Sequence, residues 1–305
     1  MRRRFAKEEG GISPTTVNTY LRCQLRFFYR YVCELIEPDS TEDDLIDNRL
    51  FGNIFHKAAQ LIYQYLAQTK ATITTMALDD LLKDEATIER VVDEAIKQEF
   101  FHIDDASRPL PALDGLQLIN REVIIKYVRQ LLESDRRLAP FRILGLEKRV
   151  SITLNDQYIS GIIDRLDSVT DPNTGLECIR VVDYKTGSRL PKPMPNVAAI
   201  FSQEAIKDHS DYYLQTLLYA HIVRSRTNEM VSPCLLFIQH AGKEDYDPTL
   251  KIGKETITDI ATYSDEFIAL FKQQLDDIYN ADMAFVPTDD QHRCETCPYA
   301  SLCRG

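Results

Sequence analysis

The spacing of apolar residues along the chain changes at Pro140. Before this residue, apolar positions recur every three or four residues, which is the period of a helix that buries one face. Ser13 followed by Pro14 suits a helix start, because serine caps the first turn and proline fits its first position. The predicted helices cover residues 13–32, 50–66, 84–101 and 116–137, and the prolines and glycine at 109, 111 and 115 predict a loop before the last of them.

After Pro140 the pattern becomes that of strands. Three segments rich in Val, Ile and Leu are separated by turn residues, at Asn155-Asp156 and at 171–175, which predicts a three-stranded meander. The predicted strands are 143–154, 158–169, 178–184 and 234–240, and the predicted helices are 211–226 and 263–280. The expected fold class is therefore α/β: a mixed β-sheet core flanked by helices, with a large helical elaboration in the N-terminal half.

The 305 residues, 44% of them hydrophobic, suffice for one large core or two small ones. We expect a single domain over 1–305, with a helical part at about 13–139, an α/β core at about 140–280 and a cysteine-rich tail at 281–305. No apolar run reaches the ~18 residues needed to cross a bilayer, and no apolar segment follows the basic start. The expectation is a cytoplasmic protein without membrane association, whose seven cysteines are reduced or metal-bound.

The net charge of −11 is unusual for a protein that holds nucleic acid through phosphate contacts. Carboxylates gathered around bound cations would account for it, because the cations then carry part of the attraction. Arg22, Arg26 and Arg30 are spaced four apart and would share one helical face, either as a local basic patch or as a solvated surface. The Gly-Lys pairs at Gly242 and Gly253 are each followed by Glu, so no ATP-binding P-loop is predicted.

Asp183 and Lys185 end an apolar predicted strand, and residues two apart on a strand point to the same face. Asp164 interrupts the preceding strand of the meander at a neighbouring position. Two carboxylates on adjacent strands form an oxygen site that suits Mg²⁺ or Mn²⁺, and a lysine beside it can orient or deprotonate an attacking water. Asp-x-Lys alone is more often an exposed salt bridge at a strand end, and the presence of Asp164 favours the metal site.

Two helical segments carry further candidate residues. His56 lies four residues after Gly52 on one helical face, and it is either a metal ligand or a core histidine bonded to a carbonyl. Gln215 and Tyr219 are one turn apart on an otherwise apolar helix, so they face the same way. Buried polar groups need partners, and a phosphate or a metal-bound water would serve.

These motifs resemble, in order and spacing, the RecB-like branch of the PD-(D/E)XK nucleases, and most closely the C-terminal nuclease domain of AddB-type helicase–nuclease subunits. The motifs are Gly52-x-x-x-His56, Gly161-x-x-Asp164-Arg165-x-Asp167, Asp183-Tyr184-Lys185-Thr186-Gly187 and Gln215-x-x-x-Tyr219. The resemblance implies a restriction-endonuclease-like fold and a metal-dependent active site made of His56, Asp164, Asp183, Lys185, Gln215 and Tyr219, with His56, Asp164 and Asp183 as metal ligands. Glu147 lies where the family often has a strand glutamate.

The tail places Cys294, Cys297 and Cys303 within ten residues, so a fourth metal ligand is expected elsewhere. Spacing alone does not separate zinc from iron–sulfur, although zinc sites more often pair two C-x-x-C units. The resemblance to AddB-like domains implies that Cys23 is the fourth ligand of a [4Fe–4S] cluster. Those domains usually have proline after this cysteine, and this chain has Gln24.

The resemblance predicts a Mg²⁺- or Mn²⁺-dependent deoxyribonuclease, an exonuclease on single-stranded DNA ends in repair or recombination. It also predicts DNA as a partner, together with a helicase or AddA-like subunit or a longer parent chain. Two alternatives remain: a nuclease-fold module that binds DNA or a helicase without cutting, and a zinc-binding interaction module. The intact set of His56, Asp164, Asp183 and Lys185 argues against an inert copy.

Overall fold

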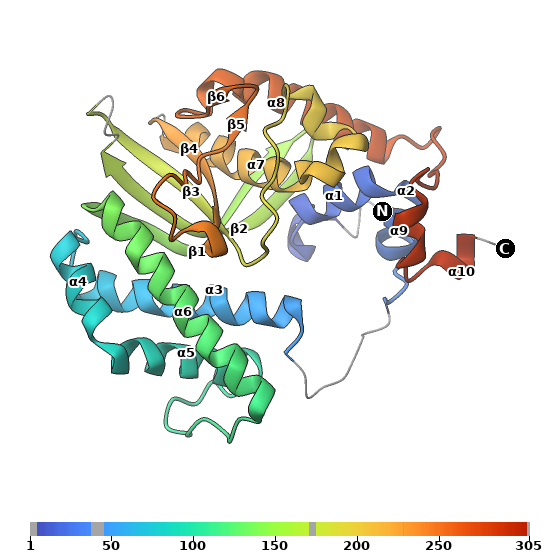
Figure 1. The fold of residues 1–305 in the computed structure, drawn as a ribbon. Helices are drawn as coiled ribbons and strands as arrows, with labels where there is room; N and C mark the ends of the chain where they lie inside the picture. Colours follow the sequence, from blue (N-terminus) through green and yellow to red (C-terminus); the bar gives the residue numbers. More distant parts are fainter. Residues whose placement is uncertain (1–4, 38–45, 171–174, 228, 304–305) are drawn as a thin grey trace.

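The structure is a computed structural model that describes residues 5–37, 46–170, 175–227 and 229–303. Its centre is a four-stranded sheet in the order β1-β2-β3-β4 (Figure 1). The strands are β1 (Phe141–Leu154), β2 (Gln157–Thr170), β3 (Glu177–Lys185) and β4 (Val231–Phe237). The first three form the predicted antiparallel meander, and β4 pairs parallel to β3, so the sheet is mixed as predicted. Most of the turn predicted at 171–175 lies outside the described residues.

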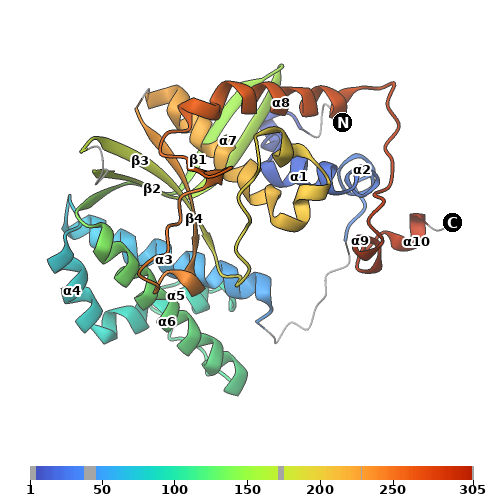
Figure 2. The same ribbon diagram turned by 45° about the horizontal axis from the view of Figure 1, so that its top comes forward.

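One face of the sheet is covered by α7 (Ser210–Thr227), which connects β3 to the parallel strand β4. A parallel connection needs a crossover of this kind. α7 is buried along most of its length, because α1 (Pro14–Arg22) and α8 (Ala261–Tyr279) pack against it on the side away from the sheet, as Figure 2 shows. This side of the sheet holds the larger hydrophobic core, with contributions from both ends of the chain.

The other face is covered by the helical elaboration. It consists of α3 (Asn48–Thr69), α4 (Thr75–Lys83), α5 (Glu85–Glu99) and α6 (Gly115–Leu138), with α3 lying along the sheet (Figure 1). A second core lies between these helices and the sheet. Asp114 and Gln117 form a reciprocal capping box that starts α6. The sequence analysis predicted three of these helices and missed α4, a short helix with only two buried residues.

The predicted helix over residues 13–32 was wrong as a continuous element. Cys23 has extended backbone angles, φ −164° and ψ 112°, which end α1 and start α2 (Gln24–Phe27), followed by a π-helical turn over Phe28–Val32. The three arginines therefore do not share one helical face. Arg22 forms an ion pair with Asp211, whereas Arg26 and Arg30 both pair with Glu37. The basic patch considered for them is largely neutralised by these carboxylates.

The remaining elements are short. The segment between β3 and α7 contains 3-10 turns at Ala198–Phe201 and Glu204–Asp208 and buries Met194, Val197 and Ile200. A small hairpin of two-residue strands, β5 (Lys251–Ile252) and β6 (Glu255–Thr256), was not predicted. Other 3-10 turns lie at Lys7–Glu9 and Ile238–His240, and the tail forms α9 (Gln291–Glu295) and α10 (Ala300–Cys303). Among the described helices, none is long and apolar enough to cross a membrane.

Candidate metal centre and cysteine cavity

Two carboxylates meet where β2 and β3 run side by side. Arg165 lies opposite Val182 in the strand register, which puts Asp164 beside Asp183 on the neighbouring strand. Asp164 Oδ2 accepts a hydrogen bond of 2.7 Å from the backbone N–H of Tyr184. The Lys185 ammonium lies 2.5 Å from Asp183 Oδ2, so Asp183 and Lys185 face the same side, as the strand alternation predicted.

Helix α3 and strand β1 bring two more groups to Asp164. His56 Nδ1 lies 3.4 Å from Asp164 Oδ2. Glu147 of β1 has a left-handed φ of 46° and lies between residues that pair with Arg165 and Ile163, which places it opposite Asp164. His56, Glu147 and Asp164 each offer a ligand atom, and these atoms lie within 4.8 Å of one another. A cation could therefore bind here to one nitrogen and two carboxylate oxygens.

The predicted ligand set His56, Asp164 and Asp183 corresponds to this cluster only in part. Glu147, which the sequence placed by resemblance alone, completes the compact group. Asp183 is not part of this group: Lys185 lies at its Oδ2, and the Gln215 side chain donates a 2.8 Å hydrogen bond to its Oδ1. If Asp183 is also a metal ligand, its carboxylate must therefore contact both the Lys185 ammonium and the cation.

The pKa values of this group reflect burial first and then the crowding of charged side chains. Burial alone would lower the pKa of His56, but the negative charges of Asp164 and Asp183 outweigh it and raise this pKa to about 9. Burial, followed by the charge of Asp164, raises the pKa of Glu147 to about 7. Burial also raises the pKa of Asp183. Such crowding is unfavourable without a compensating positive charge, and a divalent cation supplies one.

Gln215 and Tyr219 of α7 have partners within the protein. Gln215 binds Asp183, as described above, and Tyr219 packs one turn further along against β2. A Cβ atom at Gly161 would lie 2.2 Å from the Tyr219 hydroxyl oxygen, so only glycine leaves room for this ring. The half-buried Gln215 and the buried Tyr219 therefore both have contacts within the protein.

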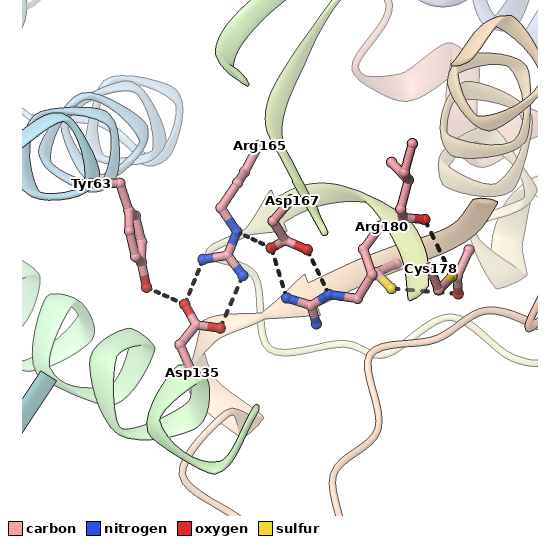
Figure 3. Close-up of polar contacts among 9 residues, drawn as sticks. Tyr63, Asp135, Arg165, Asp167, Cys178 and Arg180 are labelled. Carbon is pink, nitrogen blue, oxygen red and sulfur yellow. Dashed lines mark hydrogen bonds and ion pairs between the residues drawn. The ribbon is translucent and has the colours of Figure 1, made fainter. Parts of the chain in front are cut away.

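A buried ionic network adjoins the site, and sequence reasoning assigned it no role. Arg165, next to Asp164, is fully buried and pairs with Asp135 of α6 at 2.5 Å and with Asp167 at 2.8 Å. Asp167 in turn pairs with Arg180 of β3 at 2.8 Å (Figure 3). Charged residues inside an apolar strand were the available signal, because buried charges require partners. The partner Asp135 comes from a different layer, and no sequence pattern identifies it.

The predicted cysteine ligands line one cavity. Its volume is about 680 Å³, and Cys23, Cys294, Cys297 and Cys303 all border it, whereas Cys33 does not. The junction of α1 and α2 approaches α9 here, with Arg293 donating a hydrogen bond to the carbonyl of Arg22 (Figure 2). Two parts of the chain that are far apart in sequence therefore present their thiols to a common space.

The spacing of these four thiols can be compared with what a single zinc ion requires. Thiolates at ~2.3 Å around one zinc ion lie ~3.8 Å from one another. Within the described part of the chain, no three of these sulfurs lie within 4.8 Å of each other. The thiols that a single zinc ion would need are therefore not gathered around one point in this structure.

A mixed sheet with paired carboxylates and a lysine on two adjacent central strands, covered by helices on both faces, defines the restriction-endonuclease-like class of protein. The family model of the PD-(D/E)XK nuclease superfamily matches residues 11–304. The chain therefore belongs to this superfamily, whose members are usually metal-dependent nucleases. A search of curated proteins found no match.

Proposed function

We propose that the chain is a Mg²⁺- or Mn²⁺-dependent deoxyribonuclease and that residues 1–305 act as one nuclease domain. The observation that carries this proposal is the position of the Asp183–Lys185 pair beside the His56, Glu147 and Asp164 cluster. A bound cation would offset the negative charge that develops on the phosphate during hydrolysis. His56, Asp164 and Asp183, with Glu147, would hold it.

Each protein group then has a separate task. Lys185, as a cation paired with Asp183, orients the attacking water and favours the charge-rich transition state. Gln215 fixes the Asp183 carboxylate through their hydrogen bond of 2.8 Å. Tyr219 fills the space above Gly161 and keeps β2 and α7 in contact. The proposed site therefore combines the residues predicted from the sequence with Glu147.

The substrate that we propose is single-stranded DNA, cut from its ends during repair or recombination, in the RecB-like manner of AddB-type subunits. The order and spacing of the four motifs support this, as do cysteines that border one cavity from both parts of the chain. A helicase, an AddA-like subunit or a longer parent chain would supply the DNA end.

A cleavage assay on end-labelled single- and double-stranded DNA tests the proposal. We expect Mg²⁺ or Mn²⁺ to support cleavage of the single strand from an end, and a chelator to stop it. DNA binding without cleavage under all metal conditions would instead identify a non-cutting binding module. Cleavage of closed circular single-stranded DNA would show that the enzyme does not need an end, and it would contradict the proposed exonuclease activity but not the nuclease activity.

Replacement of Lys185 tests its task. Lys185→Ala is expected to lower kcat by roughly 10²-fold or more, which is the scale for removing one electrostatic or acid–base group. DNA affinity should change little, because Lys185 is held by Asp183 in the site. Single-turnover kinetics and a separate binding titration distinguish the two effects. A variant that loses affinity in parallel with rate would show that Lys185 only anchors phosphate.

We also propose that the four cysteines of the large cavity hold a [4Fe–4S] cluster. Four thiols from two distant parts of the chain border the cavity, and no three of them are gathered within 4.8 Å in this structure. Protein purified without oxygen should be brown and contain about four irons per chain. Zinc without iron in that preparation would refute the cluster.

Cys23→Ser tests whether the cluster ties the two parts of the chain together. Closing so long a loop is worth about 5 kcal/mol by analogy with a covalent cross-link. We expect loss of the metal and a large drop in thermal midpoint, with activity reduced indirectly, since Cys23 is not in the catalytic set. Cys33→Ser is the matched control, because Cys33 does not border the cavity. Full metal content in the Cys23→Ser protein would contradict the proposed ligand.

A further inference from the structure

Tyr212 was not among the predicted site residues, yet it lies against Lys185. The Lys185 ammonium is 4.6 Å from the centre of the Tyr212 ring and 2.5 Å from Asp183 Oδ2. The face of an aromatic ring attracts a cation within about 6 Å, more strongly when water is excluded. The ammonium is thus held by a carboxylate and by an aromatic ring.

The Tyr212 ring is itself held in place by two neighbours. His209 stacks on it with a centroid separation of 4.7 Å and an interplanar angle of 3°. Phe237 of β4, which pairs with Lys185 in the strand register, lies 6.1 Å from the ring. The ring therefore has a defined position relative to the strand that carries Lys185.

Tyr212 also belongs to a functional face of α7. Tyr212, Gln215 and Tyr219 are spaced so that they share one side of the helix. Tyr212 contacts Lys185 and Gln215 contacts Asp183, both on β3. Tyr219 contacts Gly161 on β2. The helix thus fixes the lysine and one carboxylate from the same side.

We infer that Tyr212 is a positioning residue for phosphodiester hydrolysis: its ring restrains the Lys185 ammonium in the orientation from which Lys185 reaches the attacking water. Tyr212 touches neither the substrate nor the cation in this role, and it acts only through Lys185. The inference rests on the proposed nuclease function. It predicts that the ring matters and that the hydroxyl does not.

Tyr212→Leu removes the ring, and Tyr212→Phe is the matched control that keeps it. We expect Tyr212→Leu to lower kcat roughly 3- to 30-fold, the range that corresponds to one desolvated cation–ring contact. KM for end-labelled single-stranded DNA and the half-saturating Mg²⁺ concentration should not change. Tyr212→Phe should behave like the unaltered protein. In a Lys185→Ala background, Tyr212→Leu should cause no further loss, because its effect passes through Lys185.

A spectroscopic measurement on the metal-free protein provides a readout that is independent of activity. The ε-methylene protons of Lys185, observed with ¹³C-labelled lysine and assigned by comparison with Lys185→Ala, should be shifted upfield by the ring current. The shift should persist in Tyr212→Phe and vanish in Tyr212→Leu. A Tyr212→Leu protein with unaltered kcat and resonance, or a Tyr212→Phe protein as impaired as Tyr212→Leu, would overturn this inference alone. Absence of cleavage by the unaltered protein with either cation would overturn the proposed function together with it.

Discussion

Asp183→Ala is expected to abolish DNA cleavage, with a loss of kcat of at least ~10³-fold. This exceeds the ~10²–10³-fold typical of one lost transition-state donor. The reason is that Asp183 contributes at three points: it adjoins the cation cluster, it fixes Lys185 at 2.5 Å, and it receives the hydrogen bond of Gln215. Removing it disturbs the cation, the lysine and the supporting glutamine together. Single-turnover cleavage at saturating Mg²⁺ measures the loss.

Asp183→Asn separates chemistry from folding. Burial raises the pKa of Asp183, so its ionised form costs stability in the metal-free protein at neutral pH. Asparagine removes that charge and keeps an oxygen for Gln215, and we expect a thermal midpoint that is unchanged or higher, together with no cleavage. Both variants remove the carboxylate from Lys185, but alanine also leaves Gln215 without an acceptor oxygen and should be the less stable of the two. Asp104→Asn, at an exposed loop aspartate, is the control. Cleavage by Asp183→Asn at the unaltered rate would refute the site.

The sequence was sufficient to predict the sheet because its local signals are strong. Alternating apolar residues end at Asn155-Asp156, and both of these residues adopt the positive φ that a tight hairpin turn requires. The crossover helix followed from one long helix between two strands, but the strand after it was predicted three residues too late, at 234–240, whereas β4 covers Val231–Phe237 and Ile238–His240 forms a 3-10 turn. The break at Cys23 was not predictable, because apolar periodicity continues across a single extended residue.

The site was predictable where its residues are close in sequence or lie on paired strands. Asp183 and Lys185 share a strand face, and Asp164 lies beside them once the meander is assumed. Glu147 was harder, because its position depends on an irregular stretch of β1 with a left-handed residue. The contact of Tyr212 with Lys185 depends on how α7 is rotated over the sheet. Such rotation is set by packing of the whole layer and not by local pattern.

The ionic network beneath the site is the part of the fold where a single change should cost most. Asp135 receives two hydrogen bonds from Arg165 and a third from Tyr63, and all three side chains are fully or almost fully buried (Figure 3). Removing one partner of such a pair leaves a buried charge uncompensated, which typically costs 3–5 kcal/mol. Asp135→Ala should therefore lose about 3–5 kcal/mol of the ~5–15 kcal/mol that stabilises a domain.

Urea unfolding of Asp135→Ala measures this loss, and the pH dependence of unfolding identifies its origin. Burial opposes ionisation of Asp135, but the charge of Arg165 outweighs it and lowers the pKa of this carboxyl. The stability that ionised Asp135 contributes is therefore fully present above the pKa it has in the unfolded chain. It is lost as the pH falls through the lower pKa of the folded protein. The difference in unfolding free energy between Asp135→Ala and the unaltered protein should therefore shrink in acid. Glu177→Ala, which breaks the exposed pair with Arg142, is the matched control and should barely move the urea midpoint.

The network also links the site to the helical layer. Arg165 is the residue after Asp164, Asp135 lies on α6, and Tyr63 lies two turns after His56 on α3. Because both the histidine and the carboxylate are anchored through the same buried charges, Asp135→Ala should also weaken Mg²⁺-dependent cleavage at temperatures where the protein stays folded. A urea midpoint equal to that of Glu177→Ala would contradict the assigned role of Asp135. It would mean that Asp167 alone compensates the buried guanidinium of Arg165.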